Sequence, residues 1–296
     1  MNLLDAVVSG SKDAIFAKDA AGRYLLFNRE AARVTGTVAE TVIGQDDRAV
    51  FPPDQAEQIM ANDRQAMSAD TVVTFEEHLS TADGELVFMS TKGPLRNVEG
   101  QVIGMFGISR DITPLHRAEK TREAQNQTLE MVARGAPLAN TLDTLARAIE
   151  AQGGDIRASI LRFDAAQGRL FNGASPNLPR DYVAAIDGAA IGERAGSCGT
   201  AAWRRSRVIV EDIATDPLWA DYKDLALQHG LRACWSTPIL APDHTVLGTF
   251  ALYYDTPAAP SPWHLELIEQ ATHVAAIAIA RSREESLIRK LSLAVE

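Results

Sequence analysis

Two cysteines are the side chains of this sequence best suited to covalent chemistry. Cys198 follows Gly196-Ser197 and is predicted to open a helix, whose N-terminus would lower the thiol pKa and favour the thiolate. Cys234 begins a predicted strand. The two thiols would form a redox switch if they met in space. The interpretation that the sequence favours is that both are buried as small apolar side chains.

The first half of the chain offers histidine, aromatic and methionine side chains. His78 is a candidate haem ligand, because neutral imidazole binds iron, but its alternating strand pattern favours a surface or cross-strand position. His116 is expected to be solvated. A set of apolar side chains are candidates to line a pocket, although a plain core is favoured for them. These candidates are Phe27, Phe51, Met60, Phe75, Met89 and Met105.

The known catalytic patterns are missing from the sequence. It contains no Gly-rich phosphate loop, no HExxH and no GxSxG. Two cysteines are too few for a zinc site built from four thiolates, and the carboxylates are scattered as on a solvated surface. We therefore expect neither a catalytic site nor a metal site in this chain.

Composition and sequence patterns limit the cellular compartment and the classes of binding partner that we expect for the protein. The formal net charge of −10 disfavours nucleic-acid binding, which depends on neutralising phosphates. The N-terminus lacks a signal-peptide pattern, and no stretch approaches the roughly 20 apolar residues of a membrane span. The two cysteines fit a reducing compartment. The sequence thus predicts a cytoplasmic protein without a nucleic-acid or membrane partner.

The pattern of the first half predicts an α+β domain. Residues 14–28 are predicted to form a hairpin, and a short helix at 29–35 should end at Gly36. Asp54 is expected to cap the next helix. Three strand-like runs follow, and the turns between them are predicted at Asp83-Gly84 and Glu99-Gly100. The runs are 71–81, 85–96 and 101–113.

A polar helical segment links the two halves. Residues 114–133 lack glycine, and apolar and polar side chains recur at steps of three and four, which indicates a weak or short coiled coil. Gly135 and Pro137 interrupt the segment. The predicted seam is Leu115, Ala118, Arg122, Gln125, Leu129 and Val132.

The second half is again predicted to be α+β. A helix at 138–149 opens it, Gly153-Gly154 ends that helix, and a helix at 217–229 should start at Asp216-Pro217. A further helix is predicted near 198–205. The last helix starts at Ser261-Pro262 and meets no stop signal, which indicates that the chain continues in a longer protein. Strands are predicted at 158–164, 169–175, 207–212, 232–239 and 246–254.

The first half resembles a PAS domain. The resemblance lies in DAIFAKDAAGRYLLFN, IGQDDRAVFPPDQA and the closing strand GQVIGMFGISRDIT. In PAS proteins the Asp-x-Thr junction, here Asp111 and Thr113, joins the sheet to a signalling helix. The resemblance implies a ligand-sensing domain, but because this half has no cysteine, the flavin adduct of light-sensing PAS domains is disfavoured.

The second half resembles a GAF domain, on GSCGTAAWRRSRVIVEDI, DPLWADYKDLALQHGLRACWSTPI and VLGTFALYY. A bilin is disfavoured because neither cysteine is followed by histidine, and the cyclic-GMP signature is missing. The resemblance places aromatic, hydroxyl and thiol side chains beside a ligand cavity, or else these side chains wedge long loops onto the sheet. The cavity candidates are Cys198, Thr200, Trp203, Trp219, Tyr222, Cys234, Trp235 and Thr237.

The sequence therefore predicts two domains, each a central antiparallel sheet flanked by helices. We expect a PAS-like domain at 1–113, a helical linker at 114–135, a GAF-like domain at 136–282 and an exit helix at 283–296. The resemblance implies a bacterial sensory module with no required cofactor, a small-molecule ligand, and an output domain for cyclic-di-GMP turnover. We expect a homodimer through helices 114–135 and 262–296. A ligand-free dimerisation scaffold, a chromophore or redox sensor, and the sensor region of a histidine kinase remain the alternatives.

Overall fold

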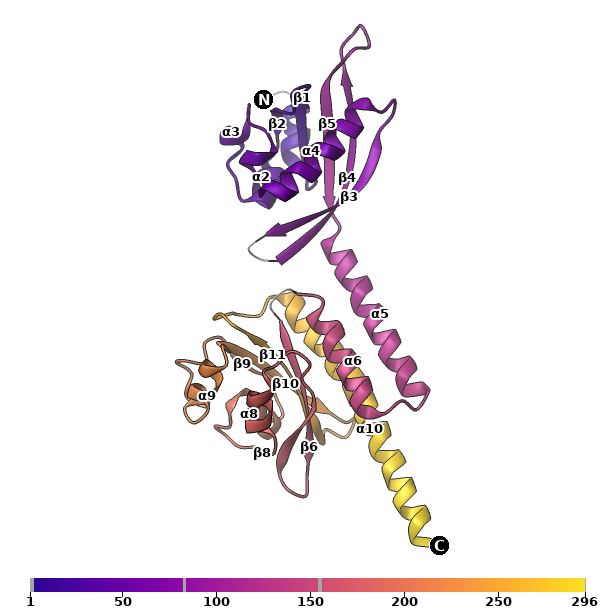
Figure 1. Ribbon diagram of the computed structural model, residues 1–296, viewed down its shortest axis with the longest axis vertical. Coiled ribbons are helices and arrows are strands. Elements are labelled where there is room, and N and C mark those ends of the chain that lie inside the picture. The colour runs from indigo at the N-terminus through magenta and orange to yellow at the C-terminus, as the bar shows by residue number, and fades with distance from the viewer. Residues whose placement is uncertain (1–2, 82–83, 154–155, 296) are drawn as a thin grey trace. The chain divides into compact units, whose positions relative to one another are not determined.

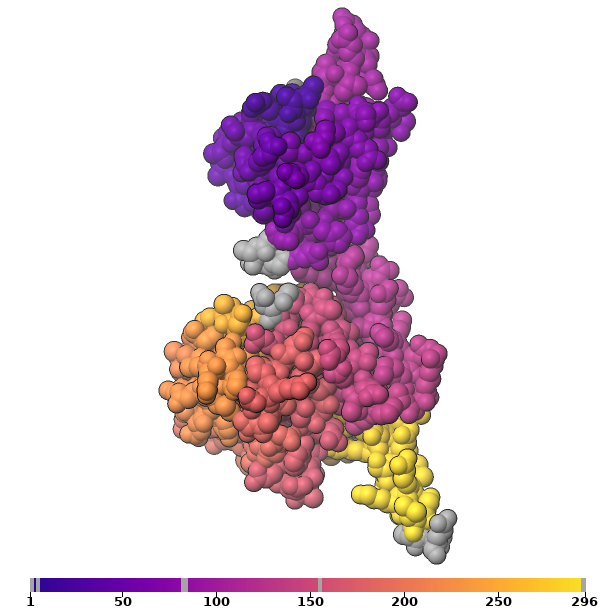
Figure 2. Space-filling view, in the orientation of Figure 1, coloured from indigo at the N-terminus to yellow at the C-terminus, as the bar shows by residue number. Residues whose placement is uncertain are grey.

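The computed structural model describes residues 3–81, 84–153 and 156–295 (Figures 1 and 2). The chain divides into two compact units between Arg117 and Ala118. Asp83 and Gly154, which belong to two of the predicted turns, lie outside the described residues. Each unit has its own antiparallel sheet and its own helices, as predicted for an α+β chain of two domains.

The first unit is a five-stranded sheet with helices over one face (Figure 1). The strand order is β2-β1-β5-β4-β3, and all neighbours are antiparallel. Its elements are α1 (Leu3–Gly10), β1 (Ala14–Asp19), β2 (Tyr24–Phe27), α2 (Arg29–Thr35), α3 (Ala39–Val42), η1 (Asp47–Ala49), α4 (Pro53–Ser68), β3 (Val73–Thr81), β4 (Gly84–Arg96) and β5 (Val102–Asp111).

Local sequence signals account for the boundaries of α2. The Asn28 side chain accepts a hydrogen bond from the backbone N–H of Ala31 and so caps the helix, and Gly36 ends it with φ of 66°. The cap expected at Asp54 is wrong. Pro52 is the N-cap of α4, and Asp54 lies in the first turn.

Helix α5 (Thr113–Ala133) follows β5 directly. Its buried side chains are Thr113, Thr121, Ala124, Thr128 and Val132, so only Val132 of the predicted seam is buried within the chain. Leu115 and Leu129 are exposed, because the helix turns a different face towards the rest of the chain. That face carries Thr121, Ala124, Thr128 and Val132. On that face the Gln125 amide donates a hydrogen bond to Gln270.

The second unit is a six-stranded antiparallel sheet of order β8-β7-β6-β11-β10-β9. The helix predicted at 217–229 is in fact two segments, because the chain leaves helical geometry around Tyr222. Beyond α5, the elements are α6 (Leu138–Glu150), β6 (Arg157–Asp164), β7 (Arg169–Ala174), α7 (Arg180–Ile186), β8 (Ala189–Ala190), α8 (Gly196–Arg204), β9 (Val208–Val210), η2 (Pro217–Trp219), α9 (Lys223–Gln228), β10 (Ala233–Leu240), β11 (Val246–Tyr254) and α10 (Pro262–Val295).

The sheet of the second unit separates two apolar clusters. On one face, Leu142 and Leu145 of α6 and Ala275 of α10 pack with Ile160 and Phe250 of the sheet. On the other face, α7, α8, η2 and α9 cover the inward side chains of β9, β10 and β11. Strand alternation produces this division, since neighbouring residues of one strand point to opposite faces.

Gly104 of β5 offers a test of how tightly the first sheet is built. A Cβ atom at Gly104 would lie 2.0 Å from the backbone oxygen of Lys18, so Gly104→Ala must push β1 and β5 apart. We expect it to destabilise the first unit by about 3 kcal/mol. Gly10→Ala, which meets nothing within 4 Å, is the matched control and should change stability by less than about 0.5 kcal/mol.

The measurement can separate the two units. All four tryptophans lie in the second unit, so tryptophan fluorescence follows its unfolding, whereas far-UV circular dichroism follows both units. In urea, Gly104→Ala should move one dichroism transition and leave the fluorescence transition in place. An unchanged dichroism curve, or an equal shift of both signals, would contradict the assignment.

Buried polar groups and the candidate ligand cavities

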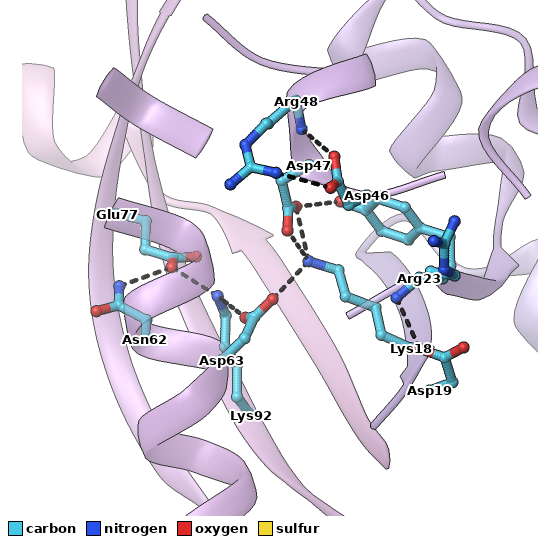
Figure 3. Close-up of polar contacts among 11 residues, drawn as sticks. Lys18, Asp19, Arg23, Asp46, Asp47, Arg48, Asn62, Asp63, Glu77 and Lys92 are labelled. Carbon is cyan, nitrogen blue, oxygen red and sulfur yellow. Dashed lines mark hydrogen bonds and ion pairs between the residues drawn. The ribbon is translucent and has the colours of Figure 1, made fainter. Parts of the chain in front are cut away.

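A chain of alternating buried charges lies between the sheet and the helices of the first unit (Figure 3). The Lys18 ammonium contacts Asp47 at 2.6 Å and Asp63 at 2.5 Å. The Lys92 ammonium contacts the other oxygen of Asp63 at 2.8 Å and Glu77 at 2.7 Å. Asp63 therefore bridges two lysines that come from different strands.

Strand alternation brings both lysines inside. Lys18 follows the buried Phe16 by two positions on β1, and Lys92 follows the buried Ser90 by two positions on β4. Both lysine side chains are fully buried. Asp63 is supplied by α4, so the charges tie this helix to the sheet.

Polar neighbours complete the ends of the chain of charges. The Tyr24 hydroxyl donates to Asp47 over 2.6 Å, and the Asn62 amide donates to Glu77 over 2.9 Å. The Lys18 ammonium also lies 4.5 Å from the centre of the Tyr24 ring. Three carboxylates and two ammonium groups leave one net negative charge when all are ionised.

The pKa shifts follow from this arrangement. Burial lowers the pKa of Lys92, but Asp63 and Glu77 outweigh it and raise that pKa above its ordinary value. Burial and, next, the charge of Asp47 raise the pKa of Tyr24 well above 10. Both groups keep their protons at neutral pH, so Lys92 stays a cation and Tyr24 stays a hydrogen-bond donor.

A cavity of about 50 Å³ adjoins these charges. Phe27 and Phe51 of the sequence candidates line it, together with Phe16, Glu77 and Ser109. The hydroxyls of Ser90 and Ser109, both at its wall, are hydrogen-bonded over 2.6 Å. The cavity is thus mainly apolar, with aromatic and aliphatic side chains beside one carboxylate and a few hydroxyls.

The other four candidates of this unit do not line the cavity. Met105 is fully buried in the neighbouring apolar cluster, and Met60 is half-buried on α4. Phe75 lies on the inner face, with its ring centre 5.8 Å from the Lys92 ammonium. Met89 is a wrong prediction. It faces outward and is exposed, because its neighbours Phe88 and Ser90 on β4 take the inner face.

The second unit has a cavity of about 40 Å³ on the α8 side of its sheet. Of the sequence candidates, Cys198, Trp219 and Tyr222 line it, and Tyr182 and Tyr253 complete the wall. The indole N–H of Trp219 donates to the Ser197 hydroxyl, and that hydroxyl donates to the backbone oxygen of Cys234, each over 3.0 Å. These bonds fix η2, the start of α8 and β10 to one another.

The remaining candidates lie elsewhere. Trp203 is exposed on α8, and Trp235 faces the opposite side of the sheet, where its indole N–H donates to Ala258. Thr237 is also off the wall and accepts a hydrogen bond from Arg207. Thr200 is buried and accepts a hydrogen bond from the backbone N–H of Ala195. This bond holds the end of the loop that precedes α8. Trp203 and Trp235 do not line this cavity, because the resemblance identifies their segments but not the face that each side chain takes.

Cys234 lies beneath the cavity, next to Cys198. The Cys198 sulfur is 3.6 Å from the Tyr253 hydroxyl, and Tyr253 pairs directly with Cys234 between β10 and β11. A hydrogen bond from Cys234 is the main cause that lowers the pKa of Cys198 to about 7. Burial raises the pKa of Cys234 well above its ordinary value.

The junction predicted at Asp111 and Thr113 joins the first sheet to α5. The Asp111 carboxylate accepts a hydrogen bond from the backbone N–H of Thr113 over 2.8 Å. The Thr113 hydroxyl accepts one from the backbone N–H of Val87 over 2.8 Å. The start of α5 is thereby held to the neighbouring strand β4 rather than left to pivot freely.

Sequence reasoning missed the chain of charges. A lysine on the apolar face of an alternating strand, as in AIFAKD and STKGPLR, was the available signal. His78 and His116 do not line the cavity. His78 is exposed between Glu76 and Glu85, and its ring contacts that of His116.

The described residues contain neither a cluster of metal-ligating side chains nor a helix suited to span a membrane. No group of three or more His, Cys, Asp or Glu side chains among residues 3–81, 84–153 and 156–295 could hold a metal ion. None of the described helices combines the length and the hydropathy that a membrane span needs.

Family models match both units. Residues 8–117 match the model of the PAS fold, and residues 135–280 match the model of the GAF domain. The two matches are in tandem and together cover most of the chain.

Three relatives are similar to parts of the chain. The methyl sulfide methyltransferase-associated sensor of Methanosarcina acetivorans is 34% identical over 69% of this chain and 20% of its own length. The methanogenesis regulatory histidine kinase FilI of Methanothrix harundinacea is 33% identical over 38% of this chain and 13% of its own. A diguanylate cyclase of Vibrio cholerae is 34% identical over 34% of this chain and 32% of its own. The chain thus spans a third or less of each relative.

Asp63 is the test of the chain of charges. Asp63→Ala leaves Lys18 and Lys92 without their shared partner, and we expect a loss of about 3–5 kcal/mol in the stability of the first unit. The double change Lys92→Met with Glu77→Leu removes opposite charges together and should cost much less.

Urea unfolding followed by dichroism measures both variants, and tryptophan fluorescence should stay unchanged because it reports the second unit. Equal losses for Asp63→Ala and the double variant would show that packing, not the buried charge, is what matters.

Proposed function

Because the chain is a PAS domain followed by a GAF domain, we propose that it is the sensory input region of a larger signalling protein, in which a small molecule bound in a cavity shifts the helices α5 and α10. The observation that carries this proposal is that, in each domain, the sheet that forms the cavity wall is also the sheet to which an exit helix is attached or packed.

In the PAS domain the connection is short. Ser109 of β5 lines the cavity, and α5 begins four residues later at Thr113. The hydrogen bonds of Asp111 and Thr113 hold that start against the sheet. A ligand that changes the position of β5 therefore changes the base of α5.

In the GAF domain the connection crosses the sheet. Tyr253 of β11 lines the cavity on one face, while its neighbour Leu252 packs with α10 on the other. A ligand can shift such an equilibrium only by its difference in affinity for the two states. Both cavities are far smaller than the roughly 300–1,000 Å³ of ordinary ligand sites, so binding must displace the covering helices or the ligand must be small.

We place the preferred ligand site in the GAF domain. Its cavity gathers the indole of Trp219, the hydroxyls of Tyr182 and Tyr222, and the thiol of Cys198. These groups suit a small polar or planar ligand. The PAS cavity, with its carboxylate and paired serines, is the second candidate site.

The output proposed for the whole protein is cyclic-di-GMP turnover, and the second candidate is a histidine kinase. Relatives with each name match parts of this chain, the cyclase over 34% of it and the kinase over 38%. In both cases the signal would leave through α10.

We further propose that α5 and α10 pair in a homodimer. Ile277, Ala280, Glu284, Leu287 and Leu291 recur on α10 at steps of three and four, and all are exposed. Figure 2 shows the last turns of α10, in yellow, projecting from the body of their own domain. A second copy would bury this seam, which is apolar except for Glu284.

Ligand binding is tested by native mass spectrometry of the purified chain and by thermal shift with a library of small metabolites. A compound present at 100 times its Kd should add about 2.7 kcal/mol of stability to the domain that binds it. Ala189→Phe places a large side chain in the GAF cavity and should abolish the thermal shift caused by the compound. Ala14→Phe, in the PAS cavity, should leave that shift in place. A dimer that binds nothing by either method would favour the ligand-free scaffold instead.

The seam is tested by Leu287→Glu with Leu291→Glu. Two charges at paired positions should raise the dimer dissociation constant at least about 100-fold, measured by analytical ultracentrifugation. Arg289→Glu lies on the opposite side of the same helix and is the control, which should leave the dimer intact. A wild-type chain that is monomeric at all concentrations would overturn the dimer proposal.

A further inference from the structure

We propose that Cys198 is a peroxide-reactive thiol and that Cys234 resolves its oxidised form to a disulfide within the GAF domain. The proposal does not depend on the ligand function proposed above. It concerns the modification of two side chains, whereas that function concerns the occupancy of the cavity.

Position makes Cys198 the reacting residue. It lies in the first turn of α8, is half-buried and forms part of the cavity wall, so a small peroxide in the cavity can reach its sulfur. Cys234 is fully buried on β10, in the cluster against which Cys198 packs. The deeper thiol is shielded from solvent and is placed to react with Cys198 rather than with a peroxide.

The surroundings of Cys198 supply hydrogen-bond donors for a thiolate. The hydroxyl of Tyr253 is 3.6 Å from its sulfur. Ser236 and Thr249 face the same sulfur, and their fully buried hydroxyls make no hydrogen bond of ordinary length with any described residue. A buried hydroxyl without a partner is costly, and a thiolate at Cys198 would accept from both.

The two thiols also differ in the direction in which their pKa values are shifted. The pKa of Cys198 is lowered to about 7, so near neutral pH about half of it is the nucleophilic thiolate. Burial raises the pKa of Cys234, which keeps it a thiol until its neighbour has reacted. This is the division between an attacking and a resolving cysteine.

The chemistry balances with a hydroperoxide as the oxidant. The Cys198 thiolate attacks the terminal oxygen of ROOH, an S–O bond forms, the O–O bond breaks, and the alkoxide takes a proton to leave as ROH. The Cys234 sulfur then attacks the Cys198 sulfenic acid. An S–S bond forms, the S–O bond breaks, and the hydroxide leaves as water with the proton of Cys234. Two thiols are oxidised and one peroxide is reduced.

The disulfide would pull the start of α8 towards β10. Ser197, next to Cys198, already joins Trp219 of η2 to the backbone of Cys234 through its hydroxyl. Oxidation therefore acts on the same wall that a ligand would contact.

The test uses the full chain, reduced and then exposed to hydrogen peroxide or tert-butyl hydroperoxide. Intact mass should fall by two hydrogens, and peptide mapping should recover Cys198 linked to Cys234. Cys234→Ser should stop at the sulfenic acid, trapped by dimedone, and Cys198→Ser should react at least about 10-fold more slowly. A disulfide between chains, or equal reactivity of Cys198→Ser and wild type, would overturn the proposal.

A second measurement does not need the disulfide. The rate of iodoacetamide alkylation of Cys198, measured in Cys234→Ser, should rise with pH through a midpoint clearly below the ordinary thiol value of about 8.5. The further change Thr249→Val, which removes one donor and keeps the shape, should move this midpoint upwards, and Thr215→Val, an exposed site, should not. A midpoint at the ordinary value in every variant would refute an activated thiol. The metabolite screen is carried out on the reduced wild-type chain, in which both thiols are unmodified, so failure of either idea is seen separately.

Discussion

The bridge that Asp63 makes between Lys18 and Lys92 is the interaction on which the PAS core depends. Taking two ammonium groups out of water costs several kcal/mol each unless their charge is matched closely. Asp63 matches both with its two oxygens, and Asp47 and Glu77 complete the pairing at the ends. Because Asp63 belongs to α4 and the lysines to the sheet, the helix over the cavity is held by charge as well as by apolar contact.

The GAF core also buries polar groups, but these are hydroxyls rather than paired charges. Its inner sheet face carries Ser159, Ser236 and Thr249, whose hydroxyls have no ordinary hydrogen-bond partner among the described residues. In the PAS domain the buried lysines and carboxylates are paired with one another, whereas here Ser236 and Thr249 face a thiol that can change its charge. In an interior of low polarity the attraction between paired charges is stronger. The free-energy cost of an unpaired polar group is higher for the same reason.

In both domains the sheet that lines the cavity also contacts an exit helix. In the PAS domain, β5 carries a wall residue and continues into α5 after the Asp111–Thr113 hydrogen bonds. In the GAF domain, alternate residues of β11 face the cavity and α10. Because a packed interior does not deform continuously, the proposed function requires a small displacement at the wall to move the helix rather than to be absorbed.

The sequence by itself determined the two α+β domains, nearly all of the strands and the principal helices, because hydrophobic periodicity and caps such as Asn28 and Gly36 act locally. It also identified Cys198, Trp219 and Tyr222 at the GAF cavity and Phe27 and Phe51 at the PAS cavity. Only the tertiary structure brought Asp47, Asp63 and Glu77 to the two lysines, since these residues come from η1, α4 and β3. It also decided that Trp235 and Met89 point away from the cavities and that Cys198 packs against the cluster that holds Cys234. The reason is that packing between distant segments, and not neighbours along the chain, settles which face of a sheet a helix covers.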